Sequence, residues 1–343
     1  MGQLRAKIDG LESRKPTMKV LLTGATGFVG SHIVDSLIAR GIATAVLLRP
    51  TSNRRFIEPH LPQLDVRIGS ITDPQSLDPA MRDITHVIHC AGCTKALHVS
   101  EFHEINHGGT RHVVEAINRQ PDRIQRLVHI SSLAASGPAP QDKPAREEDT
   151  PYPVSEYGKS KLGGEQEARR CKSDCVVLRP PAVFGPRDDG FLSLFKAVKA
   201  HILPHLGSNR LALSFVFAKD LAETTVTCLT HPAAIGKTFY VASPAIIRVH
   251  TLADEIALQL KTWTLPLPLP AAALWPVCVL QEIVSRLTGK PNVLSRQKYV
   301  ELSAPGWVCD PARLRQEIGV VCATPLRTGI AETLAWYRQQ GWL

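Results

Sequence analysis

The most informative absences in this 343-residue sequence concern charge clusters, metal-ligand spacings and apolar leaders. The net charge is +9, but lysines and arginines are scattered among acids and form no stripe of the kind that binds nucleic-acid backbones. The thirteen histidines show no HExxH or other ligand spacing. Residues 1–17 are polar and charged, without an apolar segment for a secretory route. We therefore expect no nucleic-acid partner, no metal and a cytoplasmic protein with a loose extension at residues 1–17.

The sequence also lacks a zinc-type arrangement of cysteines, although it contains eight of them. The close pairs are Cys90 with Cys93 in CAGC, and Cys171 with Cys175 in CKSDC. Their spacings do not match those of zinc sites, and the first pair ends an apolar run typical of a buried strand. Without a secretory leader, reduced thiols are the simplest interpretation.

One long stretch contains no charged residue: Thr262 to Gln281, TWTLPLPLPAAALWPVCVLQ, which has the length of a bilayer span. Four prolines, Pro266, Pro268, Pro270 and Pro276, would disrupt a helix through the middle of the lipid. We therefore expect an apolar lid or pocket wall. Shallow peripheral contact with a membrane stays open as the alternative, especially for a greasy substrate.

Short apolar runs alternate with amphipathic, helix-like segments through the first half of the chain. The runs are KVLLTG, TAVLLRP, DVRIGS, HVIHCAG, RLVHISS and CVVLRPP. Their nearly continuous apolar character is typical of strands covered on both faces. The alternation predicts repeated βαβ units and a parallel sheet, which is an α/β fold. Beyond Phe184 the pattern becomes irregular, with a late helix near Pro325 to Gln340.

A glycine-rich turn, TGATGFVG, follows the first run and places Gly24, Gly27 and Gly30 before a helix that should begin near Ser31. Glycine lets the backbone approach a pyrophosphate, and a helix N-terminus offers free N–H groups and a positive dipole. Because the turn has its strand, its helix and the first βα position, it predicts nucleotide binding.

The second run ends in LLRPTSN, where a cofactor with a free 2′-hydroxyl usually meets Asp or Glu. The residue here is Arg49, with Ser52 close behind. An arginine suits a 2′-phosphate, so this position favours NADP(H), with NAD(H) as the alternative.

Four motifs in order, TGATGFVG, HISSLAASG, YGKSK and LRPPAVFGP, resemble the extended short-chain dehydrogenase/reductase superfamily, the NAD-dependent epimerases/dehydratases. Details look closest to the branch of 3β-hydroxysteroid dehydrogenases and dihydroflavonol-reductase-like enzymes. The resemblance implies a Rossmann doubly wound parallel sheet with a smaller, mostly helical C-terminal substrate lobe. It places the NAD(P)-binding domain at residues 18–185, with a returning segment near 211–243. The lobe would then comprise residues 186–210 and 244–343.

Position by position, the resemblance also implies site residues. The catalytic group would be Ser132, Tyr157 and Lys161, with the neighbouring Ser131 a less favoured serine. The residues expected to contact the cofactor are Gly24, Thr26, Gly27, Phe28, Val29, Gly30, Arg49, Ser70, Ile71, Cys90, Ala91, Gly92, Tyr157, Lys161, Pro180 and Val183.

Some positions depart from the family pattern. Ser70 and Ile71 stand where relatives often carry an aspartate that holds the adenine amine, which puts the adenine contacts in doubt. Phe217 replaces a frequent histidine, and Asp220 is expected to start a helix. Ala182 stands where sugar-nucleotide enzymes often carry an asparagine that contacts the diphosphate.

The stretch SEYGKSK places Tyr157 and Lys161 on one face of a helix, four residues apart. A lysine ammonium, and an oxidised nicotinamide, should lower the phenol pKa from its usual value of about 10. Tyr157 could then relay a proton to a carbonyl oxygen that Ser132 aligns by a hydrogen bond. Asn106 could extend a water relay, although a cap or packing amide is the preferred interpretation.

These observations predict an NADP-dependent oxidoreductase that interconverts a ketone and a secondary alcohol on a fairly apolar small molecule. The main alternative is a nucleotide-sugar epimerase that uses the same tyrosine with tightly bound NAD(P). A third interpretation is a dinucleotide-binding regulator without turnover, against which the retained tyrosine and lysine argue. A homodimer is possible.

Overall fold

The computed structural model describes residues 18–206, 211–269, 271–288 and 296–343. The loose extension expected at residues 1–17 lies outside this part of the chain. So do residues 207–210 of the expected substrate lobe and Pro270 of the uncharged stretch.

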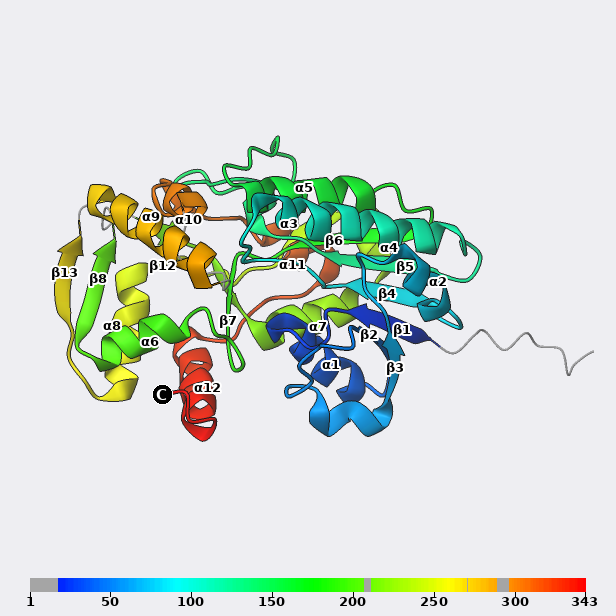
Figure 1. Cartoon of the computed structure of the whole chain (residues 1–343), viewed down its shortest axis with the longest axis horizontal. Coiled ribbons are helices and arrows are strands. Elements are labelled where there is room, and N and C mark those ends of the chain that lie inside the picture. The colour runs from blue at the N-terminus through cyan, green and yellow to red at the C-terminus, as the bar shows by residue number, and fades with distance from the viewer. Residues whose placement is uncertain (1–17, 207–210, 270, 289–295) are drawn as a thin grey trace, which may run out of the picture.

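A parallel sheet of seven strands in the order β11-β6-β5-β4-β1-β2-β3 forms the centre of the larger part of the molecule (Figure 1). Its strands are β1 (Lys19–Thr23), β2 (Ala43–Leu48), β3 (Leu64–Ile68), β4 (His86–His89), β5 (Arg126–Ile130), β6 (Asp174–Arg179) and β11 (Thr238–Tyr240). The predicted α/β fold with a doubly wound parallel sheet is confirmed. Most of the apolar runs are buried because helices cover both faces of the sheet, whereas the edge strand β3 is mostly half-buried.

Two apolar cores, one on each face of the sheet, hold these helices against the strands. The first joins the sheet to α1 (Phe28–Ala39), α7 (Ala218–Cys228) and α11 (Ala312–Ile318). The second joins it to α2 (Leu77–Ala80), α4 (Gly109–Asn118) and α5 (Glu156–Ala168). Figure 1 shows α4 and α5 above the sheet and α1 below it. Shorter elements connect them: α3 (Val99–Phe102), a π-helical turn (His103–Gly108) and 3-10 turns at Glu58–Gln63, Pro74–Ser76, Leu133–Ala135 and Pro232–Ala234.

A smaller lobe lies at the other end of the molecule (Figure 1). Its elements are α6 (Leu192–Lys199), β8 (Ile202–Leu206), α8 (Val249–Leu260), β13 (Leu265–Leu269), α9 (Ala271–Thr288), α10 (Arg296–Leu302) and α12 (Leu326–Gln339). A third apolar core holds α6, α8 and α12 together around Phe195, Ile256 and Tyr337. Two small sheets join the lobes: β7 (Ala182–Phe184) pairs with β10 (Phe215–Phe217), while β9 (Ala212–Leu213) pairs with β12 (Ile247–Arg248) and β14 (Gly306–Trp307).

Two helix starts differ from the sequence expectations. Helix α1 begins at Phe28, three residues before Ser31, because Gly27 is its N-cap and the glycine turn leads straight into the first turn. Helix α7 begins at Ala218, so Asp220 lies within its first turn instead of starting it. The Asp220 carboxylate accepts hydrogen bonds from the backbone N–H and the hydroxyl of Thr324, at 3.0 and 2.6 Å.

The uncharged stretch folds as a strand followed by a helix. Pro266 and Pro268 lie in β13, which pairs in parallel with β8. As expected from the prolines, the stretch is not one continuous helix, although α9 continues through Pro276 in its second turn. A proline there removes one backbone hydrogen bond to the preceding turn, and the helix tolerates that loss. Among the described residues, no helix has both the length and the apolar content to cross a bilayer.

Candidate functional site

A cavity of about 880 Å³ opens along the carboxyl ends of the sheet strands. Parallel strands all end at the same edge, which is where open α/β sheets bind ligands. Every residue predicted as catalytic or cofactor-binding lines this cavity. The structure therefore brings the complete predicted set together, while the role of each residue stays a prediction.

The glycine-rich turn forms one wall of the cavity. Gly24 has φ +78°, and a Cβ there would lie 2.6 Å from the backbone nitrogen of Ala91. A Cβ on Gly30 would lie 2.0 Å from the carbonyl oxygen of Gly24, so both positions require glycine. Gly27 caps α1 without any side-chain hydrogen bond to the helix N-terminus. This close backbone and this open helix end fit the pyrophosphate of a dinucleotide.

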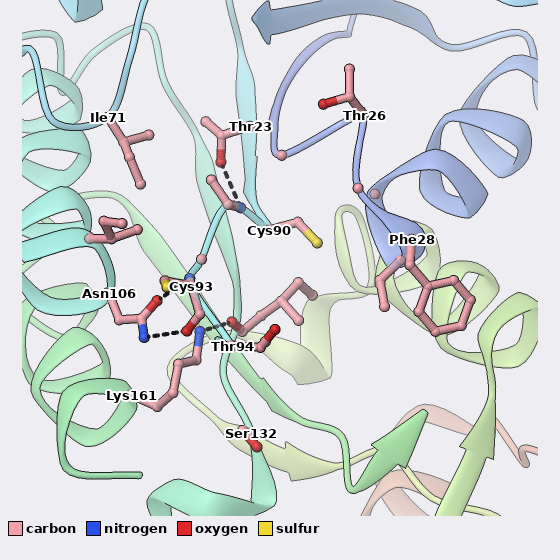
Figure 2. A pocket seen from close by; sticks show the side chains of 18 of the residues that line it. Thr23, Thr26, Phe28, Ile71, Cys90, Cys93, Thr94, Asn106, Ser132 and Lys161 are labelled. Atoms are coloured by element: carbon pink, nitrogen blue, oxygen red, sulfur yellow. Dashed lines mark hydrogen bonds between the residues drawn. The ribbon is translucent and has the colours of Figure 1, made fainter. Parts of the chain in front are cut away.

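The loop after β4 is held against this wall by side chains from neighbouring elements (Figure 2). Thr23 Oγ1 accepts a hydrogen bond from the Ala91 N–H at 3.2 Å. Asn106 clamps Cys93 from the other side: its Oδ1 accepts from the Cys93 N–H at 2.7 Å, and its Nδ2 donates to the Cys93 carbonyl at 2.9 Å. Nδ2 also donates to Ser160 Oγ at 2.9 Å. With both ends of its amide engaged, Asn106 acts as a packing amide that shapes the loop.

Lys161 is almost fully buried, and its side chain runs from α5 toward the centre of the cavity (Figure 2). Its Nζ donates a hydrogen bond to the Ile130 carbonyl at 2.7 Å. Burial lowers the pKa of Lys161 to about 8, while the Cys90 thiol and Glu165 oppose that shift. The ammonium form therefore still predominates at neutral pH, but it can lose its proton just above neutrality.

Tyr157 lies one turn before Lys161 on α5 and lines the cavity together with Ser132. Burial raises the pKa of Tyr157 to about 12, and this effect exceeds the lowering by Ser132. The negative charge of Glu301 raises the pKa further. The expectation that Lys161 lowers this pKa is thus wrong for the chain's own residues, because the desolvation of a phenolate outweighs the favourable contacts.

The two adjacent serines of the HISSL motif point to different partners. Ser131 Oγ donates to Glu165 Oε1 at 2.6 Å within the protein interior. Glu165 is in turn paired with Arg179, whose Nη2 lies 2.7 Å from Glu165 Oε2, and both side chains are at most 2% exposed. Ser132 Oγ accepts a hydrogen bond from the Ala134 N–H at 3.1 Å, and Ser132 lowers the pKa of Tyr157. Both serines line the cavity, and the preference for Ser132 over Ser131 stays a prediction.

The end of β2 carries the residues expected to discriminate between cofactors. Arg49 is exposed and lines the cavity, and its guanidinium has no ion pair among the described residues. Ser52 Oγ accepts from the Arg49 backbone N–H at 3.1 Å and so stabilises the turn that presents the arginine.

The residues after β3 were expected to lie near the adenine. Ser70 Oγ bonds to Thr72 Oγ1 at 2.8 Å, and Ile71 is buried. Where relatives often carry an aspartate, this chain therefore has the apolar Ile71 and Ser70, whose hydroxyl is already hydrogen-bonded to Thr72.

Four charged residues that line the cavity, Lys95, Glu104, Asp188 and Asp189, were not anticipated from the sequence. Lys95 and Asp189 both line the cavity and form an ion pair at 3.2 Å across it. Asp188 is buried, and burial raises its pKa to about 6. The DDG triplet after the FGP motif was the available signal for the two aspartates, but acids in a loop are too common to single out.

The structure also bears on the uncharged stretch and on the cysteines. The described residues of the uncharged stretch, which was expected to form a lid or pocket wall, do not line the cavity. Within the described part of the chain, no group of three His, Cys, Asp or Glu side chains could hold a metal ion, and the eight cysteines are free thiols.

Comparisons with known proteins all point to one enzyme family. The model of the NAD dependent epimerase/dehydratase family matches residues 20–242. A ceramide reductase from Caulobacter vibrioides is 30% identical over 335 residues, which cover 94% of this chain and 96% of the relative. A UDP-glucose 4-epimerase from Vibrio cholerae is 29% identical over 300 residues, which cover 82% of this chain and 88% of the relative. The crystal structure of the Bordetella bronchiseptica enzyme WbmG in complex with NAD shares the fold, with a TM-score of 0.76, 23% identity and 97% coverage of both chains.

Proposed function

Because the chain belongs to the NAD dependent epimerase/dehydratase family, whose members use NAD(P), we propose that it is an NADP-dependent oxidoreductase acting on a lipid-like ketone or the corresponding secondary alcohol. The observation that carries this proposal is that Ser132, Tyr157 and Lys161 line the same cavity as the glycine-rich turn. An alcohol-forming active site needs an aligned carbonyl, a proton donor and a hydride source, and this cavity has a place for each.

The raised pKa of Tyr157 suits reduction. A phenol with a pKa of about 12 carries its proton at neutral pH and can give it to the carbonyl oxygen. Ser132 aligns that oxygen by a hydrogen bond. A nicotinamide dinucleotide, when bound, supplies the hydride that the carbonyl carbon takes up. One hydride and one proton then convert the ketone into the alcohol.

The lipid-like character of the substrate rests on two observations. The ceramide reductase relative aligns over nearly the whole length of both chains. The smaller lobe, in addition, exposes many large apolar side chains on α9: Trp275, Val277, Leu280, Ile283, Val284 and Leu287. Ala182, at the place of the diphosphate-contacting asparagine, gives a sugar nucleotide no polar side chain there.

A nucleotide-sugar epimerase is the second candidate, and the 29% identity with a UDP-glucose 4-epimerase favours it almost as strongly. The same Tyr157 would then remove and return a proton while the cofactor stays bound. For either activity we propose a cytoplasmic location, where NADPH is available and eight free thiols stay reduced.

The test is NADPH consumption by the purified full-length protein against a panel of ketones and UDP-sugars. Stoichiometric formation of an alcohol from a long-chain ketone such as a 3-ketoceramide supports the proposal. Conversion between UDP-glucose and UDP-galactose without net redox change supports the epimerase. Tight NADPH binding without either reaction contradicts both and favours a non-catalytic dinucleotide-binding protein.

A further inference from the structure

An exposed apolar face lies on the two-stranded ribbon formed by β8 and β13. In their parallel register Ile202 stands directly opposite Leu265, and Leu267 lies two residues further along the same face of β13. These side chains are 46%, 63% and 47% exposed. Trp263, immediately before β13, is 63% exposed and stacks on the ring of His201 at 4.4 Å. We call Ile202, Trp263, Leu265 and Leu267 the ribbon face.

The surroundings of the ribbon face are basic and contain no acid nearby in the chain. Lys199 precedes β8 and Lys261 precedes Trp263 by two residues; both are exposed, as is Lys196 on α6. None of the three forms an ion pair among the described residues. The sequence has no Asp or Glu from residue 190 to 219 or from 256 to 281, the two segments that form α6, the ribbon and the first half of α9.

The ribbon lies at the far end of the smaller lobe from the strands β2 and β3 (Figure 1). None of its residues lines the dinucleotide cavity. Covering the ribbon face would therefore leave the cavity open.

We propose that the ribbon face is a docking surface for an anionic phospholipid bilayer. Tryptophan favours the interface between headgroups and acyl chains, and exposed leucine and isoleucine side chains gain by leaving water. Lysines beside such a surface are attracted to anionic headgroups, by about 1 kcal/mol each. The proposal rests on the proposed function in one respect: a lipid-like ketone would be taken from the bilayer.

A second copy of the chain fits this surface less well. In a symmetric dimer the same face packs against itself, so the three lysines of each copy would approach the three lysines of the other copy. An anionic bilayer offers the opposite charge to all of them. The charge pattern therefore distinguishes two occupants that would both cover apolar side chains.

The test is flotation of the purified full-length protein with vesicles of phosphatidylcholine, with and without phosphatidylglycerol. We expect binding to the anionic vesicles only. Lys199→Gln with Lys261→Gln should weaken it roughly fivefold for each lysine. Trp263→Ser with Leu265→Ser should weaken it about tenfold or more. The matched control is Ile235→Ser, which removes a 42% exposed isoleucine outside the ribbon and should bind like the wild type.

Failure of the wild type to float, or equal binding by all variants, overturns the proposal. A dimer in sedimentation experiments that Trp263→Ser with Leu265→Ser dissociates, without vesicle binding, assigns the face to a second copy. The lysine variant changes only exposed side chains, so it keeps the test valid if the apolar variant misfolds. Flotation needs no turnover: vesicle binding without ketone reduction would refute the proposed function alone, and turnover of a water-soluble ketone should be unchanged in every variant.

Discussion

Glu301, on α10 of the smaller lobe, accepts a hydrogen bond from Ser155 Oγ at 2.7 Å. Ser155 is the N-cap of α5, and its hydroxyl also accepts from the Gly158 N–H at 3.1 Å. Tyr157 follows two residues later, and the charge of Glu301 raises the pKa of its phenol. A side chain 146 positions away thus both anchors the catalytic helix and helps to keep its tyrosine protonated.

Replacing Glu301 with glutamine should lower the Tyr157 pKa, because the amide keeps an acceptor for Ser155 but carries no charge. In the direction of alcohol oxidation, which needs the phenolate, the pH–rate profile should shift to lower pH. The measurement is kcat against pH for Glu301→Gln beside Glu58→Gln, an exposed glutamate outside the cavity. An unshifted profile would show that the phenol does not feel this carboxylate during turnover. Groups that also face the phenol are Ser132, Cys90 and Cys93.

Tyr157→Phe should retain the fold and NADPH binding while turnover falls about a hundredfold or more, because only the proton donor is lost. Tyr152→Phe is the matched control, since Tyr152 is 76% exposed and does not line the cavity. Initial rates and NADPH fluorescence titration measure the two effects. Undiminished turnover in a folded, cofactor-binding Tyr157→Phe protein would sink the proposed chemistry.

Replacing Ser132 should mainly lower the rate of turnover, whereas replacing Ser131 should mainly lower the stability of the fold. Ser132→Ala removes the group that aligns the carbonyl oxygen, so kcat should fall about a hundredfold, while the lost cap on the Ala134 N–H should cost about 1 kcal/mol of stability. Ser131→Ala removes a donor from the buried Glu165, so the free energy of unfolding should fall by about 1–3 kcal/mol. Steady-state kinetics and urea unfolding on both variants measure these quantities. The reverse pattern would reassign the catalytic serine.

Arg49→Ala should weaken NADPH binding about tenfold or more and leave NADH binding unchanged, because only the 2′-phosphate would meet the guanidinium. Arg82→Ala, an exposed arginine that does not line the cavity, serves as the control. Dissociation constants for both cofactors from fluorescence titration give the answer. An equal loss for NADPH and NADH would mean that Arg49 does not read the 2′-phosphate.

Arg179→Met should cost about 3–5 kcal/mol of unfolding free energy, because it leaves the fully buried Glu165 carboxylate without its main partner. Arg170→Met is a suitable comparison: Arg170 also pairs with a glutamate, but its side chain is 72% exposed. That variant should lose less than about 1 kcal/mol. Urea unfolding monitored by fluorescence compares them, and similar losses would contradict the importance assigned to burial.

The features that the sequence predicted correctly share one property: each depends on residues that are close together in the chain. The apolar runs became sheet strands because nearly continuous apolar segments are buried from both faces. The glycine turn and its helix are adjacent in the chain, as are Tyr157 and Lys161 on one helical face. The prolines of the uncharged stretch correctly indicated that no single helix runs through it, because Pro266 and Pro268 lie in β13, although α9 continues through Pro276.

By itself, the sequence determined the parallel α/β architecture, the glycine-rich cradle and the tyrosine–lysine pair, because each depends on residues within a few positions of one another. Only the tertiary structure decided the Tyr157 pKa, the different partners of Ser131 and Ser132, the Lys95–Asp189 pair and the contact of Glu301 with α5. These features depend on burial and on contacts between distant segments. Desolvation and long-range contacts exist only after the chain has packed, and no local pattern encodes their balance.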